Sequence, residues 1–274
     1  MATIAHVIFY SLVGGVFSLA GGFLLLSNTK IAGLLARYAT PFAAGALLSA
    51  AFIDLLSEAA HAGDIDQALQ YTLIGILAFF LLERFLHWFH HHHVHEDKKM
   101  DPRVSLIIVG DTIHNFIDGI AIASGFLVNV QTGVVVTLAV AAHEIPQEIG
   151  DFGLLLHKGL TRRKVVIVNV LSATATTVAA VAFFLLGNEY TIPIDTVLGM
   201  VAGFFIYIAV SDIIPTIHKN EEKVLAGPQT LLLMLGVLTV GVVTTMLHGI
   251  IEQEVPTTHS HEQSSHVEDA HHHE

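Results

Sequence analysis

Eight long apolar stretches dominate the sequence and decide which folds the chain can adopt. A helix that crosses the hydrocarbon core of a bilayer needs about 20 predominantly apolar residues. The stretches cover residues 4–26, 38–60, 68–88, 104–127, 132–156, 164–187, 194–217 and 229–251, with polar or Gly- and Pro-containing segments between them. We therefore expect an all-α membrane protein with eight transmembrane helices, embedded in a lipid bilayer as one domain over residues 1–252.

The composition agrees with a membrane protein and excludes several classes of function. Only 13% of the residues are charged, about half the share in a soluble domain. The net charge of −12 leaves no basic surface for nucleic acid. The chain has no cysteine, so thiolate metal sites and cysteine nucleophiles are excluded. Its 19 histidines outnumber the 12 Lys and Arg residues, and histidine is the commonest metal ligand.

The distribution of charge predicts the orientation of the chain in the membrane. With eight spans, the 12 Lys and Arg residues all lie in or beside the first, third, fifth and seventh connections. The opposite side carries acidic residues, which include Asp64, Asp66, Glu189 and Asp195. Cytoplasmic loops carry the excess of Lys and Arg. We therefore expect a multi-pass protein of the cell (inner or plasma) membrane with both termini outside the cytoplasm.

Two histidine-rich segments flank the spans. The connection at about 89–103 contains a run of histidines from His90 to His95, and the segment 253–274 is rich in histidine and acidic residues. Both have the low complexity of solvated, disordered segments. The charge pattern places the first as a cytoplasmic loop and the second as an extracytoplasmic tail. Each is either a spacer or a weak site of transition-metal capture.

The fourth span carries ionisable residues at a depth where they are rare. Asp111, His114, Asn115 and Asp118 follow one another at helical spacing and form one polar stripe. A charged side chain at the centre of a bilayer costs about 2.5–3.5 kcal/mol on insertion scales, so such residues are usually functional. His114 and Asp118 are four residues apart and can bind one cation together.

The fifth span repeats this arrangement in the sequence H-E-I-P-Q-E-I-G-D. His143 and Gln147 are four residues apart, while Glu144 and Glu148 form a neighbouring stripe. Pro146 removes a backbone donor and is expected to distort the helix at this point. No Lys or Arg lies in these two spans, so a metal ion or protons must balance the carboxylates. We expect a metal site between helices four and five, in the centre of the bundle.

The mixture of ligands narrows the choice of metal. Imidazole suits zinc, iron, nickel and copper, whereas carboxylate suits magnesium, calcium and manganese. A mixed set therefore favours a divalent first-row transition metal, of which Zn²⁺ is the commonest. Packed face to face, the two helices would bring His114, Asp118, His143 and Gln147 around one point, with Asn115 and Glu144 towards a second.

Other polar residues of the spans are candidates for a transport pathway or for contacts between helices. Each lies on a predicted helix and offers an oxygen atom: Asp54, Glu58, Glu148, Asp151, Asn169 and Asp212.

The two central motifs resemble those of the ZIP (Zrt-, Irt-like Protein) family of metal transporters. They are H-N-F-I-D-G at 114–119 and H-E-I-P-Q-E at 143–148. The second is similar to the H-E-x-P-H-E box of one branch of the family. Further similarities are N-V-L-S-A-T at 169–174 and A-G-F-F-I-Y-I-A-V-S-D-I-I-P at 202–215.

The resemblance implies import of zinc and related divalent ions, such as iron, manganese or cadmium, into the cytoplasm. It also implies a two-part metal site between helices four and five, and a homodimer. The first position would use His114, Asp118, His143 and Gln147. The second would use Asn115, Asp118, Glu144 and Gln147. Gln147 departs from the family pattern, because other members carry histidine or glutamate there.

Three hypotheses remain for the function. The first is a secondary importer that works by alternating access around a site near the midplane, with the metal as its substrate and no cofactor required. The second is a cation-diffusion exporter, which typically has six spans and an inner terminal domain. The third is an intramembrane metalloprotease, whose zinc motif needs histidine where Gln147 stands. The first hypothesis accounts for the most observations, so we do not expect an enzyme.

Overall fold

The computed structural model describes residues 2–92, 102–190, 192–219 and 226–252. All regular structure within these ranges is helical, which confirms the predicted all-α class. The first half comprises α1 (Ile4–Gly14), η1 (Val16–Leu19), α2 (Ala20–Ser27), α3 (Thr29–Ser49), η2 (Ala50–Leu55), α4 (Leu56–Ala62), α5 (Ile65–His92) and α6 (Pro102–Val128). The second half comprises α7 (Val130–His157), α8 (Arg162–Glu189), α9 (Ile194–Tyr207), η3 (Ile208–Ile213), α10 (Ile214–Lys219) and α11 (Ala226–Glu252).

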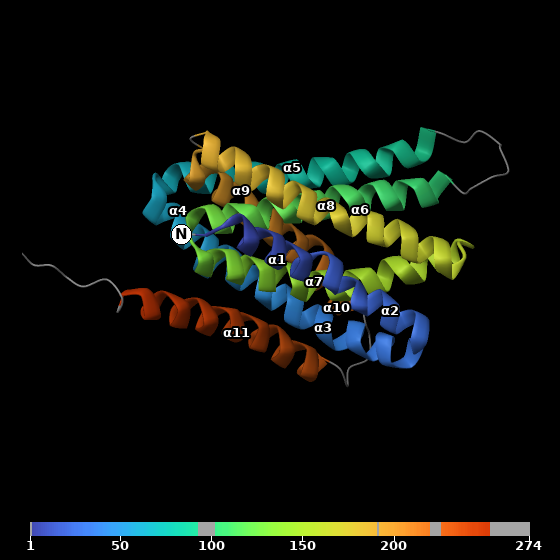
Figure 1. Cartoon of the computed structure of the whole chain (residues 1–274). Helices are drawn as coiled ribbons and strands as arrows, with labels where there is room; N and C mark the ends of the chain where they lie inside the picture. The colour runs from blue at the N-terminus through green and yellow to red at the C-terminus, as the bar shows by residue number, and fades with distance from the viewer. Residues whose placement is uncertain (1, 93–101, 191, 220–225, 253–274) are drawn as a thin grey trace, which may run out of the picture.

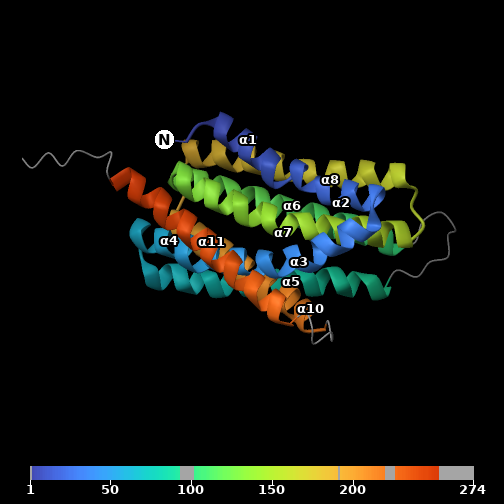
Figure 2. The same ribbon diagram turned by 90° about the horizontal axis from the view of Figure 1, so that it is seen from below.

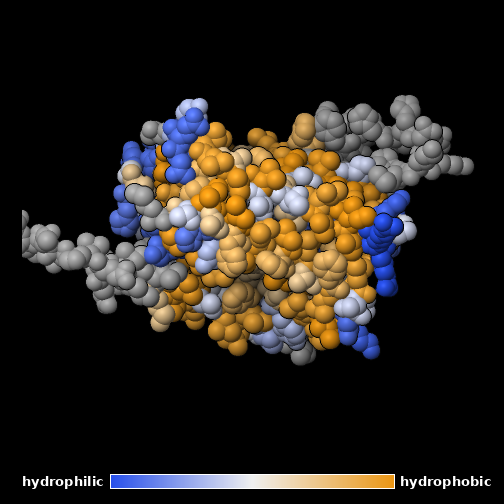
Figure 3. Space-filling model, in the orientation of Figure 1, coloured by the Kyte–Doolittle hydropathy of each residue, from blue (hydrophilic) through white to orange (hydrophobic). Residues whose placement is uncertain are grey.

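Within the described residues these elements form rods, numbered in chain order as α1–α2, α3–α4, α5, α6, α7, α8, α9–α10 and α11. The rods run roughly parallel to one another (Figure 1). Within the described residues, seven spans are long and apolar enough to cross a membrane. The exception among the predicted eight is α7, whose polar and acidic side chains lower its hydropathy, although it is 28 residues long. A broad hydrophobic face occupies the middle of the molecule, and hydrophilic residues gather at the two ends of the rods (Figure 3). The fold is that of a multi-pass membrane protein.

Two helical segments extend beyond the predicted apolar spans. The second rod begins at Thr29, well before the predicted residue 38, because the side chain of Asn28 caps the helix by accepting hydrogen bonds from the backbone of Lys30 and Ile31. The loop predicted at 89–103 is shorter, since α5 continues to His92 and α6 begins at Pro102. The length of an apolar run reflects the thickness of the membrane, whereas the length of a helix depends on where its backbone is capped. The rest of this loop and the tail 253–274 lie outside the described residues.

The ends of the chain agree with an even number of crossings. The start of α1 and the end of α11 lie at one end of the bundle, which we call the terminal end (Figures 1 and 2). The end of α5 and the start of α6 lie at the opposite end, which we call the loop end (Figure 1). The structure thus places both described chain ends together, away from the predicted histidine-rich loop.

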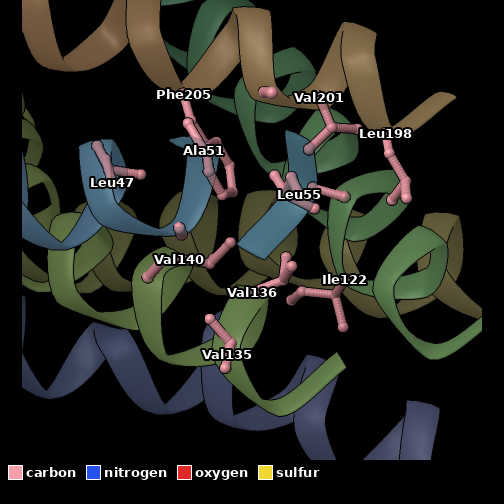
Figure 4. Packing of buried hydrophobic residues seen from close by; sticks show 14 of the residues in the cluster. Leu47, Ala51, Leu55, Ile122, Val135, Val136, Val140, Leu198, Val201 and Phe205 are labelled. Atoms are coloured by element: carbon pink, nitrogen blue, oxygen red, sulfur yellow. The ribbon is translucent and has the colours of Figure 1, made fainter. Parts of the chain in front are cut away.

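Helix α7 lies in the centre of the bundle. It packs against α3 and α6 and also contacts α1, α2, α8 and α11. Apolar residues fill its boundary with α3 and η2, where Leu47 of α3 and Ala51 of η2 belong to one cluster with Val136 and Val140 (Figure 4). Because other helices surround α7, its acidic side chains face protein instead of lipid. This position explains how a helix with a low hydropathy fits within the bundle.

Two rods contain π-helical turns. They are η2 on the second rod and η3 on the seventh, and each packs against the α-helical part of the other rod. Asp54 occupies the fifth position of η2 and Asp212 the same position of η3. Single π-turns are frequent at functional sites. The distortion expected at Pro146 does not interrupt the helix, since α7 continues as an α-helix through this residue. The two π-helical turns lie on other rods.

A glycine sets the separation of α6 from α8 beside the polar stripe. A Cβ atom at Gly119 would collide with the backbone carbonyl oxygen of Thr176 and lie 2.8 Å from the Cβ of Ala179. Only the missing side chain allows this approach. Thr176 can therefore reach Asn115 on α6, where its hydroxyl donates a 2.8 Å hydrogen bond to the amide oxygen.

Gly119→Ala should destabilise the protein by about 1–3 kcal/mol, because overpacking forces the two backbones apart. We expect a lower thermal unfolding midpoint in detergent. Gly150→Ala is the matched control. A Cβ at Gly150 has no atom within 4 Å, and this substitution raises helix propensity by the same amount as Gly119→Ala. Equal midpoints for the two variants would contradict the close-packing argument.

Candidate metal centre

Four side chains from α6 and α7 converge inside the bundle. They are His114, Asp118, His143 and Glu144, and their ligand atoms all lie within 4.8 Å of one another. We call them the quartet. Three of the four were predicted for the first metal position. The fourth is Glu144, which the sequence analysis placed towards the second position.

The distances within the quartet fit a tetrahedral ion. The Nε2 atoms of the two histidines are 3.2 Å apart. Asp118 Oδ2 lies 3.4 Å from His143 Nε2 and 3.8 Å from His114 Nε2. Glu144 Oε1 lies 3.5 Å from His114 Nε2 and 3.8 Å from His143 Nε2. A tetrahedral zinc ion with bonds of about 2.0–2.1 Å separates its ligands by roughly 3.3 Å, so the quartet needs only small shifts to bind one.

Burial requires that the negative charge at this point be balanced by a cation or by protons. Asp118 and Glu144 are each 1% exposed, and none of their four carboxylate oxygens has a hydrogen-bond partner among the described residues. Carboxylates without such partners are very costly away from water. Two carboxylates with two neutral imidazoles carry two negative charges, which one divalent cation balances. A set of ligands with the neutral Gln147 in place of Glu144 would carry only one negative charge.

Surrounding groups fix the orientation of the two histidines. The Nδ1 atom of His143 lies 3.0 Å from the carbonyl oxygen of Ala139, which favours the tautomer that leaves Nε2 free to bind metal. The ring of Phe79 on α5 meets the ring of His114 edge-on, at 5.9 Å between centroids. Phe205 on α9 meets His143 in the same manner at 6.3 Å. The side chain of His114 is 14% exposed, whereas the other three are almost fully buried.

Asn115 has partners of its own beside the quartet. Its amide nitrogen donates to Asp111 Oδ1 at 2.9 Å, and its amide oxygen accepts from Thr176. It therefore joins α6 to α8 and positions Asp111. Asp111 and Thr176 were not among the predicted site residues. The four-residue spacing from Asp111 to Asn115 could have indicated Asp111. No local spacing could indicate Thr176, because it lies on a separate helix.

The structure distributes the candidate pathway residues over several helices. Asp54 is buried within η2, and Glu58 is half-buried on α4. Glu148 is buried on α7, and Asp151 is half-buried beyond it. Asn169 is buried on α8, where its amide donates to the carbonyl oxygen of Val165. The backbone of Asp212 belongs to η3, and its side chain lies outside the description. Gln147 is half-buried on α7.

Comparison with known proteins assigns the family. The model described as ZIP zinc transporter matches residues 90–244, more than half of the chain. The chain belongs to the ZIP zinc transporter family. This confirms the family that the sequence resembles. The family consists of transporters, so the comparison gives no support to the exporter of another family or to the metalloprotease.

Several curated relatives support the assignment. Human zinc transporter ZIP4 is 34% identical over 132 residues, which is 46% of this chain and 20% of that protein. Zinc transporter foi of Drosophila melanogaster is 33% identical over 150 residues, 55% of this chain and 20% of the relative. Rat metal cation symporter ZIP8 is 32% identical over 125 residues, 46% of this chain and 27% of the relative. The matched region thus spans well under a third of each of these relatives.

The choice between Glu144 and Gln147 can be tested by metal binding. Glu144→Gln removes a negative charge from the quartet, so we expect the Zn²⁺ affinity of the purified protein to fall about tenfold or more. Asp118→Asn should behave in the same way. Gln147→Ala should cost much less. Isothermal titration calorimetry gives the affinities, and a loss for Gln147→Ala as large as that for Glu144→Gln would restore Gln147 to the first position.

Proposed function

We propose that this protein is a secondary transporter that imports divalent transition-metal ions, zinc foremost, into the cytoplasm. The observation that carries the proposal is the quartet, a buried and doubly negative set of nitrogen and oxygen ligands between two helices of a membrane-spanning bundle. The names of the relatives, zinc transporter and metal cation symporter, agree with this cargo. Iron, manganese and cadmium are secondary candidates, because imidazole and carboxylate together suit several of these ions.

The route of the ion follows from the placement of the acidic side chains. Asp54 and Glu58 lie on the rod whose last part, α4, reaches the terminal end (Figure 1). An ion from outside meets these carboxylates, exchanges water for protein ligands and binds the quartet. It then leaves towards the loop end and the histidines of the α5–α6 connection. In this proposal residues 1–252 form the transporter and 253–274 an extracytoplasmic tail.

The packing suggests which parts move. Helices α1, α2, α6, α7 and α8 contact one another and contain the quartet, while α3, α5, α9 and α11 pair mainly among themselves. The boundary between the two groups is lined by small apolar residues such as Ala51 and Val140 (Figure 4). Such a boundary has few polar contacts to break. We propose that the first group moves against the second, and that the π-helical turns η2 and η3 absorb the change.

Transport is tested by time-resolved uptake of Zn²⁺ into proteoliposomes, with Fe²⁺, Mn²⁺ and Cd²⁺ as competitors. We expect saturable uptake that falls to the protein-free background in Asp118→Ala and His143→Ala, because each removes a ligand. Asp66→Asn is the control, since Asp66 is exposed and lies outside the quartet. Undiminished uptake in Asp118→Ala would refute the site, and metal binding without any flux would refute transport.

The orientation, with both termini outside a plasma or inner membrane, is also a proposal. Arg163 and Glu189 are exposed residues near opposite ends of α8, and the chain has no other cysteine to interfere. In intact cells, a membrane-impermeant maleimide should label Glu189→Cys, at the terminal end, and should label Arg163→Cys only after permeabilisation. The reverse pattern would invert the topology. The homodimer that the family resemblance implies is tested by light scattering in detergent.

A further inference from the structure

The two histidines of the quartet are held in different ways. The Nδ1 atom of His143 lies 3.0 Å from the carbonyl oxygen of Ala139, one turn earlier on the same helix. His114 forms no hydrogen bond through its Nδ1 atom to any residue that the structure describes, since its polar contacts all involve Nε2. A histidine that binds a metal almost always has its other ring nitrogen fixed by a hydrogen bond. His114 therefore needs another means of orientation.

The ring of Phe79 on α5 supplies this orientation. It meets the ring of His114 edge-on, with 5.9 Å between the centroids and 87° between the planes. Edge-to-face contact is a preferred arrangement of two rings, and it fixes their relative orientation. The side chain of His114 is 14% exposed, more than any other member of the quartet. Phe79 thus packs on the ligand that is held neither by deep burial nor by a hydrogen bond at its second nitrogen.

Phe79 is itself held by two rings of α9. Its centroid lies 5.7 Å from that of Phe204 and 5.4 Å from that of Tyr207. The hydroxyl of Tyr207 donates a 2.5 Å hydrogen bond to the carboxylate of Glu83, which lies one turn after Phe79 on α5. Hydrogen bonds to a carboxylate are roughly twice as strong as those between neutral groups. We call Phe79, Tyr207 and Glu83 the clamp.

The backbones of α5 and α9 touch one another one turn before the clamp. A Cβ atom at Gly75, four residues before Phe79, would collide with the carbonyl oxygen of Met200. The same holds for Gly203, four residues before Tyr207, against the backbone of α5. Helices packed this closely deform little and transmit displacement. We therefore expect α5 and α9 to move as one body that carries the ring of Phe79.

We propose that Phe79 is a positioning residue for the metal ligand His114, and that Tyr207 and Glu83 hold it in place. When α5 and α9 move relative to α6 and α7, the ring of Phe79 leaves His114, which becomes free to turn away from the ion. The loss of one ligand opens a position for water and starts the release of the ion. The positioning of His114 does not depend on transport, whereas its link to movement rests on the proposed function.

The dissociation rate of Zn²⁺ tests the positioning role. The full-length protein in detergent is loaded with Zn²⁺ and mixed rapidly with a chelator, and the kinetic phase that disappears in Asp118→Ala belongs to the quartet. We expect Phe79→Leu to accelerate this phase about tenfold or more, as is usual when a histidine ligand loses the group that orients it. Tyr207→Phe removes only the hydroxyl and should accelerate the phase by a smaller factor.

Phe205→Leu is the matched control. Phe205 meets the ring of His143 at 6.3 Å and is 1% exposed, whereas Phe79 is half-buried. A purely structural effect of losing a ring would therefore be larger at Phe205. We expect the opposite, because the contact with the carbonyl oxygen of Ala139 holds His143 without help from a ring. Leu81→Ala, at an exposed position of α5, should leave the dissociation rate unchanged.

Co²⁺ in place of Zn²⁺ gives a spectroscopic signature of the ligands. Its visible absorption band is strongest in tetrahedral coordination, and the histidine-rich segments are the same in every variant, so differences between variants come from the quartet. We expect Phe79→Leu to weaken and shift this band, and Phe79→Tyr, which keeps the ring, to restore it. Glu83→Gln keeps an acceptor for the hydroxyl of Tyr207 and should have a smaller effect than Glu83→Ala.

Each outcome decides the proposal. An unchanged dissociation rate in Phe79→Leu overturns it, and so does an equal or larger effect of Phe205→Leu. If Phe79→Leu loses its fold, as judged by its thermal unfolding, Tyr207→Phe decides instead. Faster release of Zn²⁺ from that variant supports the clamp, and release at the rate of the unaltered protein overturns it.

Uptake into proteoliposomes separates this proposal from the proposed function. Phe79→Leu should raise the KM for Zn²⁺ while the maximal rate falls by less than about twofold, because a loss of binding alone raises only KM. Faster dissociation in Phe79→Leu together with an absence of zinc flux in the unaltered protein would sink the transporter and leave the positioning role in place. Zinc flux with an unchanged dissociation rate would do the reverse.

Discussion

Carboxylates that are buried among helices without a basic partner are the constraint on which this structure depends. The neighbouring helices α6 and α7 carry five acids, and neither of the two predicted spans contains Lys or Arg. Asp118, Glu144 and Glu148 are almost completely removed from water and accept no hydrogen bond from the part of the chain that the structure describes. Their charge is tolerated only with cations or protons. The same cost that makes these residues rare in membranes makes the site a strong attractor for a divalent ion.

The arrangement of the bundle follows from the need to shield these side chains. Helix α7 carries most of the acids and takes the central position, surrounded by helices that expose large apolar residues to the outside. Glycine at 119 allows α6 and α8 to approach, which places the hydroxyl of Thr176 on Asn115. The outer helices α5 and α11 are the least buried, consistent with a role as the lipid-facing wall. The packing of the bundle and the metal ligands thus both centre on α6 and α7.

The quartet mixes two imidazoles with two carboxylates at tetrahedral spacing. A binding site that conducts an ion must bind the ion and must also release it. Aromatic rings from α5 and α9 press on the two histidines from the other group of helices. Movement between the groups would therefore change the packing of the ligands themselves.

The sequence alone determined the class of the protein, the eight rods and the identity of the helices that carry the site. These features follow from local properties: the length of an apolar run, the placement of basic residues, and the spacing of polar residues along a helix. Hydropathy could not place the start of the second rod, because the cap at Asn28 and not the membrane boundary begins that helix. The His-rich tail stays a prediction.

Only the tertiary structure decided which side chains meet. A helical wheel pairs His143 with Gln147, four residues on. Consecutive residues such as His143 and Glu144 are 100° apart around the helix, and both can still face a point that lies between their two directions. The rotation of α7 about its axis, set by packing against α3 and α6, brings Glu144 to the two histidines. Such long-range rotation depends on the shapes of many side chains at once, and this is why no local pattern in the sequence contains it.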